Sequence, residues 1–282
     1  YAYFMEMGCG KSKVLIDNIY WLWQEKEIDT AIIIAPKGVY MNWKNAELPI
    51  HLHEDIDPDI YIWKAEGTKA HKKNLLEGAF KRDKFRILLI NVESFATKKA
   101  LVFLESFTHR SKFLLAIDES TTIKNIKAKR TKAIVKFGDT AKYKRILTGS
   151  PITQSPMDLY SQCYFLDKDL LGFDSYWSFQ GRYAIIKQQR MGNHSFNQVV
   201  GFKNLEELSD KLYNFAYRVT KEQALDLPEK IYTIRHVPLT SDQIRHILAT
   251  QNKMIETRRL IDFKMMMRQD SLLAMHKRQE EV

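Results

Sequence analysis

Short apolar runs alternate with longer helical or polar stretches over residues 1–166. The runs read YAYFM, AIIIAP, IYIW, RILLIN, FLLAID and RILTG. Each run has the length of a strand, and its unbroken apolar character indicates that both faces of the strand are covered. Strands that alternate with helical stretches are typical of a parallel sheet with crossover helices. The pattern therefore predicts an α/β lobe over residues 1–166, a parallel sheet with helices on both faces.

The pattern changes after residue 166. Residues 167–217 are rich in aromatic side chains and mostly helical in their periodicity, which predicts an appended helical subdomain. The run KIYTIRHVPL at 230–239 resembles a strand. From Ser241 to Val282 the sequence contains neither Pro nor Gly and predicts a helix, with Thr240 or Ser241 as its N-cap.

The segment YFMEMGCGKSK at 3–13 carries the strongest chemical signal. An apolar strand leads into glycines, a lysine and a hydroxyl residue, and then into a helical stretch. Glycines let backbone N–H groups wrap phosphates, the lysine reaches the outer phosphates, and the hydroxyl binds Mg²⁺ at the helix N-terminus. Met5 stands where the usual template has its first glycine. We interpret the segment as an ATP-binding phosphate loop rather than a simple glycine turn, with nucleotide-binding residues Met7, Gly8, Cys9, Gly10, Lys11 and Ser12.

A second segment, KFLLAIDES, ends an apolar strand with adjacent carboxylates at Asp118 and Glu119. Such a pair is usually a helix N-cap when it stands alone. A phosphate loop 107 residues upstream (118 minus 11) favours a catalytic role instead. We expect Asp118 to hold Mg²⁺ together with Ser12, Glu119 to orient the attacking water, and Lys11, Asp118 and Glu119 to be the catalytic residues.

A third segment, RILTGSP, is another strand that runs into small and hydroxyl residues. A plain turn, with Pro151 opening the next helix, explains this pattern adequately.

In this order and spacing, the three segments resemble the motifs of the superfamily-two helicases, and among them the Swi/Snf-type ATPases that translocate along double-stranded DNA. Similar motifs are IIIAPKGVYMNW after the second strand, LLINVESF, AIDESTTIKN and LTGSPITQSPMDLYSQ. The Swi/Snf assignment rests on YRVTKEQALDLPEKIYTIRHVPLTSDQ, which is similar to the family's signature after the first lobe.

The resemblance implies a RecA-like ATP-binding lobe at 1–166, a helical protrusion at 167–217, a return segment at 218–239 packed on the lobe, and a helical connector at 240–282 toward a second RecA-like lobe. It implies that Thr148, Gly149 and Ser150 couple hydrolysis to movement. It also implies a nucleic-acid partner, with double-stranded DNA favoured, contacted by Pro36, Lys37, Asn91, Ser94 and Lys124. The compact motif style is similar to bacterial and bacteriophage members, which implies a cytoplasmic protein of a bacterial or phage-infected cell.

The sequence departs from the family pattern in two ways. The box reads DEST rather than DEAH or DEGH, so Ser120 and Thr121 stand where coupling residues usually lie, and we expect altered coupling at most. No second lobe, arginine-finger motif or upstream adenine-reading glutamine is found. QGRYAIIKQQR at 180–190 superficially resembles the finger motif, but its apolar alternation fits helix packing within the protrusion.

Composition adds little to these expectations. The net charge of +10 and the pI near 9.3 suit an anionic partner without requiring one. Two cysteines, Cys9 and Cys163, are too few for a disulfide framework and fit a reducing compartment. The apolar runs fall far short of the roughly 20 residues of a membrane span. The basic run IKNIKAKRTK, which includes Lys124, suits a phosphate track and a solvated helix face equally. Because the first residue is tyrosine, we expect the natural chain to begin earlier.

Three alternatives stay open at this point. The chain could belong to a strand-separating DNA or RNA helicase, which shares the first three motifs. It could be a non-catalytic, nucleotide-gated interaction scaffold. It could also be an unrelated phosphate-loop kinase or small-molecule ATPase.

Overall fold

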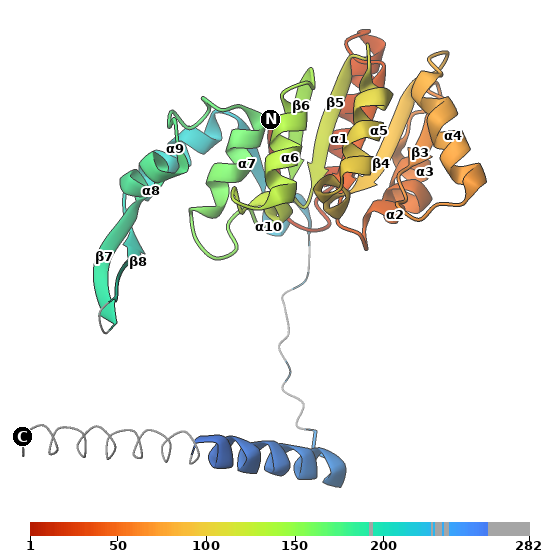
Figure 1. Cartoon of the computed structure of the whole chain (residues 1–282). Coiled ribbons are helices and arrows are strands. Elements are labelled where there is room, and N and C mark those ends of the chain that lie inside the picture. Colours follow the sequence, from red (N-terminus) through yellow and green to blue (C-terminus); the bar gives the residue numbers. More distant parts are fainter. Residues whose placement is uncertain (192–193, 227, 229–232, 234–236, 259–282) are drawn as a thin grey trace, which may run out of the picture. The chain divides into compact units, whose positions relative to one another are not determined.

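The computed structural model describes residues 1–191, 194–226, 228, 233 and 237–258. The chain divides into two units, Tyr1–Leu227 and Pro228–Val282. The first unit is built around a seven-stranded sheet with the strand order β3-β4-β2-β5-β6-β1-β9, in which all strand pairs are parallel (Figure 1). Its strands span Ala2–Met5 (β1), Thr30–Ala35 (β2), Asp59–Ile62 (β3), Arg86–Asn91 (β4), Phe113–Asp118 (β5), Tyr143–Leu147 (β6) and Ala216–Val219 (β9).

Helices cover both faces of this sheet, as the apolar runs predict (Figure 1). The helices span Lys11–Gln24 (α1), Tyr40–Asn42 (α2), Leu48–His51 (α3), Lys69–Phe80 (α4), Lys98–Thr108 (α5), Lys129–Gly138 (α6), Asp158–Leu166 (α7), Tyr176–Tyr183 (α8), Leu205–Tyr213 (α9) and Lys221–Ala224 (α10). Short helical segments of other types span Trp43–Glu47 (η1), Val92–Ala96 (η2) and Ser120–Ile123 (η3).

Side chains of each central strand alternate between two apolar cores. In β2, Ile32 and Ile34 pack into the core that α5, α6 and α7 share, whereas Ile33 packs into the core that contains α1. A strand that must be apolar on both faces reads as an unbroken apolar run, which is why AIIIA and RILLI show no alternation in the sequence. The predicted α/β fold is therefore confirmed.

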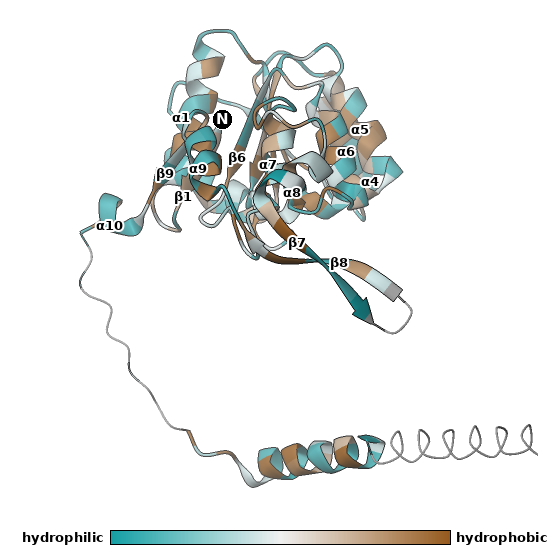
Figure 2. Ribbon diagram, turned by 90° about the vertical axis from the view of Figure 1, so that its left-hand side faces the viewer, coloured by the Kyte–Doolittle hydropathy of each residue, from teal (hydrophilic) through white to brown (hydrophobic). Residues whose placement is uncertain are grey.

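The segment at 167–217 is only partly helical. Helices α8 and α9 flank an antiparallel hairpin, β7 (Ala184–Met191) and β8 (His194–Phe202), which projects from the end of α8 (Figure 2). The expectation that 180–190 packs as a helix is wrong, because strand β7 begins at Ala184. β-Branched residues at 185–186 and 199–200 favour a strand, and the Gly-Asn dipeptide between the two runs is a hairpin signal.

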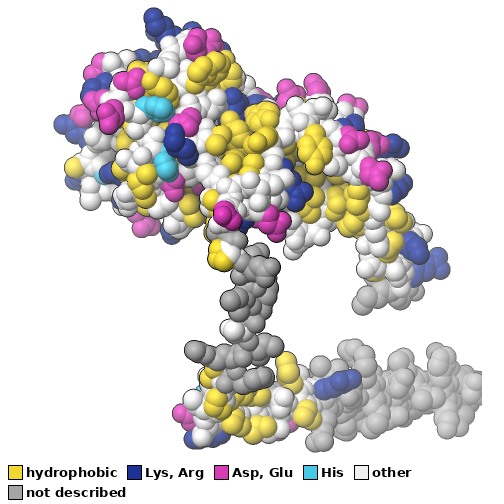
Figure 3. Space-filling model, turned by 180° about the vertical axis from the view of Figure 1, so that it is seen from behind, with side chains coloured by type: hydrophobic (Ala, Val, Ile, Leu, Met, Phe, Trp, Pro, Cys, Tyr) yellow, Lys and Arg dark blue, Asp and Glu magenta, His cyan; other side chains and the backbone are white. Residues whose placement is uncertain are grey.

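The hairpin is exposed on both faces beyond its base. In Figure 3, where it lies at the right, hydrophobic side chains appear nearer its base and Lys and Arg side chains nearer its tip. The protrusion also ends two residues earlier than predicted, because Ala216 and Tyr217 already belong to β9.

The second unit contains a helix at 241–258. Thr240 caps it reciprocally: its Oγ1 accepts from the Gln243 N–H at 3.3 Å, and its own N–H donates to Gln243 Oε1 at 2.9 Å. The predicted N-cap is thus confirmed, whereas the predicted continuation to Val282 lies outside the described residues. Most of the strand predicted at 230–239 also lies outside them, and the described residues 233 and 237–239 are not in a strand.

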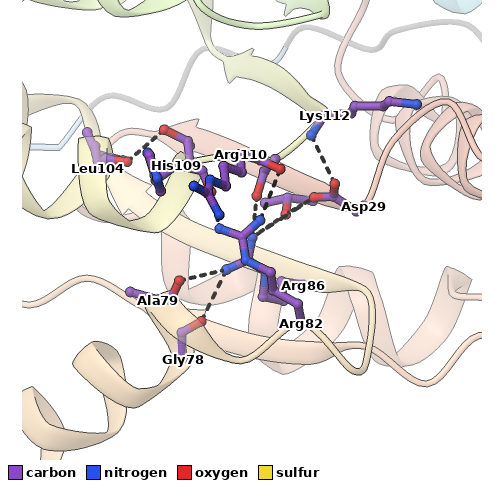
Figure 4. Close-up of polar contacts among 12 residues, drawn as sticks. Asp29, Gly78, Ala79, Arg82, Arg86, Leu104, His109, Arg110 and Lys112 are labelled. Atoms are coloured by element: carbon purple, nitrogen blue, oxygen red, sulfur yellow. Dashed lines mark hydrogen bonds and ion pairs between the residues drawn. The ribbon is translucent and has the colours of Figure 1, made fainter.

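A buried arginine, Arg86, connects several elements at the end of the sheet where the strands begin (Figure 4). Arg86, at the start of β4, is 1% exposed. Its Nη1 donates to the carbonyl oxygens of Gly78 and Ala79 at the end of α4, and its Nη2 donates to Thr30 Oγ1 at 2.8 Å and Ser111 Oγ at 2.6 Å. One side chain therefore joins β4, α4, β2 and the turn before β5.

Replacing this arginine should destabilise the first unit strongly. We expect Arg86→Met to lower the free energy of unfolding by about 3 kcal/mol or more, because buried carbonyl and hydroxyl acceptors lose their donor. Arg82→Met is the matched control, since Arg82 is exposed and donates only to backbone oxygens at the surface. Urea unfolding followed by tryptophan fluorescence should separate the two variants, and equal midpoints would contradict this role of Arg86.

Candidate functional site

The loop between β1 and α1 has a backbone that suits glycine. Gly8 and Gly10 have φ angles of +87° and +84°, and a Cβ at either position would meet no atom within 4 Å. The requirement is therefore conformational rather than steric. Gly10 ends the loop without a side-chain cap on α1, and the first turn of α1 contains no acidic residue. The N-terminus of α1 thus offers uncapped N–H groups and the positive end of the helix dipole to an anion.

Lys11 lies at the mouth of this loop. Its Nζ donates to the carbonyl oxygen of Met5 at 2.9 Å and to that of Glu6 at 3.3 Å. The ammonium group therefore lies on the inner side of the loop, where it could contact an outer phosphate of a bound nucleotide. Ser12 follows in the first turn of α1, half-buried.

Asp118 is the last residue of β5 and is 9% exposed. Its Oδ2 accepts from Trp43 Nε1 at 2.9 Å, and its Oδ1 accepts from the Glu119 N–H at 3.1 Å. Burial raises the pKa of the Asp118 carboxyl, and Glu119 raises it further, whereas the hydrogen bond from Trp43 and the charge of Lys11 lower it. Trp43 thus both orients the carboxylate and favours its charged form.

Glu119 adopts a left-handed conformation, with φ 52° and ψ 63°. This is an uncommon conformation for a residue other than glycine, and it is found disproportionately at functional sites. Thr148 Oγ1 donates to Glu119 Oε2 at 3.2 Å and also accepts from the Ser150 N–H at 3.2 Å. The second and third motifs are therefore joined by one threonine hydroxyl.

Gly149 brings the third motif against the phosphate loop. A Cβ at Gly149 would lie 3.4 Å from the carbonyl oxygen of Met5 and 3.4 Å from the nitrogen of Met7. Any side chain larger than a methyl group would press on the loop backbone. The close approach explains the glycine that a plain turn would not need.

One cavity of about 380 Å³ collects the residues of all three motifs. Its lining includes Met7, Lys11, Glu119, Thr121, Thr148, Gly149 and Ser150. Strand pairing explains the convergence, because Asp118 pairs with Leu147 in β6, and Leu147 pairs with Tyr3 in β1. The three loops thus leave neighbouring strands at the same edge of the sheet, which is where ligands bind in open α/β folds.

Ser12 and Asp118 do not line this cavity, but each is next in sequence to a lining residue, Lys11 or Glu119, and their oxygen donors suit Mg²⁺ bound together with a nucleotide. Mg²⁺ usually keeps several waters and takes one or two protein oxygens plus substrate phosphates. Ser12 and Asp118 offer one hydroxyl and one carboxylate. Among the described residues, no group of three or more His, Cys, Asp or Glu side chains could hold a metal ion.

The predicted nucleic-acid residues do not form one cluster with the cavity. Lys37 is exposed and Pro36 is half-buried after β2. Asn91 caps η2, and its Oδ1 accepts from the N–H and the Oγ of Ser94, at 2.9 and 2.7 Å, so both side chains have a structural role. Lys124 donates to Thr153 Oγ1 at 2.6 Å. Contact of these residues with nucleic acid stays a prediction.

Sequence reasoning missed a buried polar bridge between the second and third motifs. Ser120 Oγ, fully buried, donates to Gln162 Oε1 at 2.6 Å, and Gln162 Nε2 donates to the carbonyl oxygen of Pro151 at 2.8 Å. Asp158 completes the bridge by accepting from the Thr153 and Gln154 N–H groups. The signal in the sequence was the polar residues Asp158, Ser161 and Gln162 within an otherwise apolar helix, α7.

Glu6 ties the phosphate loop to the far edge of the sheet. Its N–H donates to the carbonyl oxygen of Val219 at 2.9 Å, and its carboxylate accepts from the Lys221 N–H at 3.1 Å. Lys221 also lines the nucleotide cavity. The segment that leads from β9 into α10 therefore borders this cavity.

A parallel sheet with a glycine loop, a lysine and an Asp-Glu box at its carboxyl edge defines a phosphate-loop nucleotide-binding protein. Residues 4–281 match the model of the SNF2-related domain family, and the chain belongs to that family. This membership removes the alternative of an unrelated phosphate-loop kinase.

Curated relatives extend well beyond this chain. It is 26% identical over 246 residues to the mouse chromodomain-helicase-DNA-binding protein 1-like, which covers 86% of this chain and 25% of that protein. It is 36% identical over 118 residues to the TATA-binding protein-associated factor MOT1 of Saccharomyces cerevisiae, which covers 41% of this chain and 6% of that protein. The chain thus spans a quarter or less of these relatives.

Solved structures agree with this assignment. The Sulfolobus solfataricus SWI2/SNF2 ATPase core in complex with double-stranded DNA is similar with a TM-score of 0.57 and 25% identity, covering 78% of this chain and 40% of that chain. The relatives named here are eukaryotic and archaeal, and the expected bacterial or bacteriophage type stays a prediction. Within the described residues, no helix has the length and apolar character needed to cross a membrane.

Loss of the Trp43 donor should impair the Asp118 carboxylate, which we predict to hold Mg²⁺. We expect Trp43→Phe in the full-length protein to raise the Mg²⁺ concentration for half-maximal ATP hydrolysis about tenfold, as is typical when a residue that supports a metal ligand is removed. Because the Trp43 hydrogen bond lowers the pKa of Asp118, its loss should also move the acid limb of the pH–rate profile to higher pH. Trp21→Phe, at an exposed position on α1, is the control. Identical Mg²⁺ dependence in both variants would contradict this role.

Ser120 and Gln162 should behave as an energetically coupled pair. Ser120→Ala or Gln162→Leu alone leaves a buried partner unsatisfied and should cost about 1 to 3 kcal/mol. The double variant should cost less than the sum of the two, with a coupling of about 0.5 to 3 kcal/mol. A double-mutant cycle by urea unfolding measures this coupling, and strictly additive losses would argue against the bridge.

Proposed function

We propose that this chain is the ATP-binding lobe of a Mg²⁺-dependent motor that hydrolyses ATP and translocates along double-stranded DNA. The observation that carries the proposal is the convergence of Lys11, Glu119 and Thr148, from three separate loops, on one cavity. The chain's membership of the SNF2-related family, and the double-stranded DNA bound by the similar Sulfolobus core, support the choice of DNA.

The phosphate loop would bind the nucleotide. N–H groups of the loop and of the first turn of α1 would surround the phosphates. The Lys11 ammonium would exchange its two carbonyl acceptors for outer phosphate oxygens, a step that costs little because it replaces hydrogen bonds with hydrogen bonds.

Glu119 would orient the attacking water and take up its proton. The Thr148 hydroxyl holds one oxygen of the Glu119 carboxylate, which fixes the direction of the other. Ser12 and Asp118 would hold Mg²⁺. When bound, this ion neutralises charge that develops between the β- and γ-phosphates.

Thr148, Gly149 and Ser150 would couple the chemistry to motion. Loss of the γ-phosphate would change the position of Glu119, and the Thr148 hydroxyl donates a hydrogen bond to the Glu119 carboxylate. Gly149 lies against the phosphate loop, and the Ser120–Gln162 bridge leads on to Pro151. A shift at the phosphates therefore has a short and rigid route into the third motif.

The other half of the catalytic site would come from a second RecA-like lobe of the same full-length protein. In related phosphate-loop enzymes, an arginine from a facing element contributes roughly 10³- to 10⁵-fold in rate. We therefore expect this chain alone to bind ATP weakly and to hydrolyse it poorly. The proposal that the protein acts in the cytoplasm of a bacterial or phage-infected cell rests on motif style alone.

Steady-state ATP hydrolysis by the full-length protein tests the proposal. We expect stimulation chiefly by blunt duplex DNA, with Lys11→Ala and Glu119→Gln each reducing the rate at least about 100-fold, because they remove phosphate binding and water activation. Lys13→Ala, at an exposed position in the same helix, is the matched control for Lys11→Ala.

Other outcomes identify the alternatives. Equal or greater stimulation by single-stranded DNA or RNA favours a strand-separating helicase. A wild-type rate that Glu119→Gln leaves unchanged indicates a nucleotide-gated scaffold, and no response to any nucleic acid overturns the motor.

A further inference from the structure

Beyond its base, the β7–β8 hairpin packs against no other element among the described residues. From Ile185 to Val200 every residue whose side chain is described is exposed. Phe196 is 48% exposed and Val200 45%. An isolated two-stranded ribbon is marginally stable in water because it has no second layer. A ribbon of eight and nine residues that leaves the body of the unit therefore points to an external binding partner.

The charge of the hairpin indicates the chemistry of that partner. Residues 184–203 contain no Asp or Glu, whereas Lys187, Arg190 and Lys203 are basic. None of these three cations forms an ion pair within the described part of the chain. The neighbouring helix α9 begins with two glutamates, one of which pairs with Arg182. Within the described residues, no ion pair therefore offsets the positive charge that Lys187 and Arg190 place on the ribbon.

The register of the hairpin distributes polar side chains over both faces. Gln188 pairs with Asn197 on one face, and Lys187 pairs with Gln198 on the other. Arg190 lies on the first face, two residues beyond Gln188. Amide side chains donate and accept hydrogen bonds, as base edges and sugar–phosphate groups do. The exposed apolar residues Ile185, Ile186, Val199 and Val200 gather at the base of the hairpin, and the amides separate them from Phe196 farther along it.

We propose that the β7–β8 hairpin binds duplex DNA as a ribbon laid in the major groove, with Lys187 and Arg190 on the phosphates. A two-stranded ribbon fits the roughly 12 Å width of that groove. Eight residues at about 3.3 Å each span about 26 Å, enough to cross it. Single strands would need a row of stacking aromatics, and the described ribbon residues offer one, Phe196.

This inference rests on the proposed DNA motor and adds a contact outside the ATP-binding edge. Figure 1 shows the hairpin projecting from α8, away from the seven-stranded sheet. The hairpin belongs to the same unit as the nucleotide site. DNA held by it therefore stays attached to this lobe in every nucleotide state, while the contacts made by a second lobe are free to change.

The test measures, by fluorescence anisotropy, how tightly the full-length protein binds a 30-base-pair duplex without ATP. The KCl concentration is varied from 50 to 300 mM. Each phosphate contact contributes about −0.9 to the slope of log affinity against log salt. The double variant Lys187→Ala, Arg190→Ala should reduce the slope by about 2 and raise Kd about tenfold or more at 0.1 M salt. Basal ATP hydrolysis should not change.

The matched control is Lys72→Ala, Lys73→Ala on α4, an equal charge loss at exposed positions beside β3, at the opposite edge of the sheet. An unchanged Kd and slope in the hairpin variant, with duplex-stimulated ATP hydrolysis intact in the wild type, overturns the hairpin inference alone. The opposite pattern is also informative. If the hairpin variant binds duplex DNA more weakly, but duplex DNA does not stimulate ATP hydrolysis by the wild type, the result supports the hairpin contact and overturns the motor.

Two further results would overturn the commitment to duplex DNA. An equal loss of affinity for single-stranded DNA or RNA indicates a general phosphate contact. A change in oligomeric state in the hairpin variant, with DNA binding intact, indicates a protein interface.

Discussion

The position of β1 between β6 and β9 is the constraint on which the site depends. On the β6 side of β1, the Thr148 N–H donates to the carbonyl oxygen of Tyr3. On the β9 side, the Glu6 N–H donates to the carbonyl oxygen of Val219. The phosphate loop therefore leaves a strand that is hydrogen-bonded on both edges, and its start cannot shift without breaking main-chain bonds. The glycine conformations, the reach of Lys11 and the approach of Gly149 all follow from that fixed origin.

The same edge of the sheet combines rigid donors with a carboxylate that is held partly out of water. Asp118 is buried, which raises its pKa, and Trp43 opposes that effect with a hydrogen bond. Glu119, beside it, is half-buried and faces the cavity. Two adjacent carboxylates thus have different surroundings, and this difference suits one to metal binding and the other to handling a proton.

Local patterns predicted the fold and the three loops that meet at the cavity, whereas contacts between residues distant in sequence were missed. The phosphate loop and the Asp-Glu box are readable because each stands at the end of an apolar strand, and parallel strands bring such ends together. Trp43 and Asp118 are 75 residues apart, and Ser120 and Gln162 are 42 apart. The hydrophobic periodicity of the sequence does not show which buried polar groups will form hydrogen bonds across such separations. The hairpin at 184–202 was misread because a short run with two isoleucines fits either a strand or a helix.

The pairing of β1 with β9 has a consequence for how the protein is made. Met5 ends β1, and Ala216 begins β9, 211 residues later (216 minus 5). At roughly 5 to 20 residues per second, a ribosome needs about 10 to 40 seconds to cover that interval. During this time β1 is already synthesised but lacks both neighbours until β6 is made and lacks β9 throughout, so the phosphate loop has no anchor at Val219. Strand β1, which precedes the other strands of this sheet in the sequence, is thus among the last to be completed, and an aggregation-prone strand edge persists through most of the translation of this lobe.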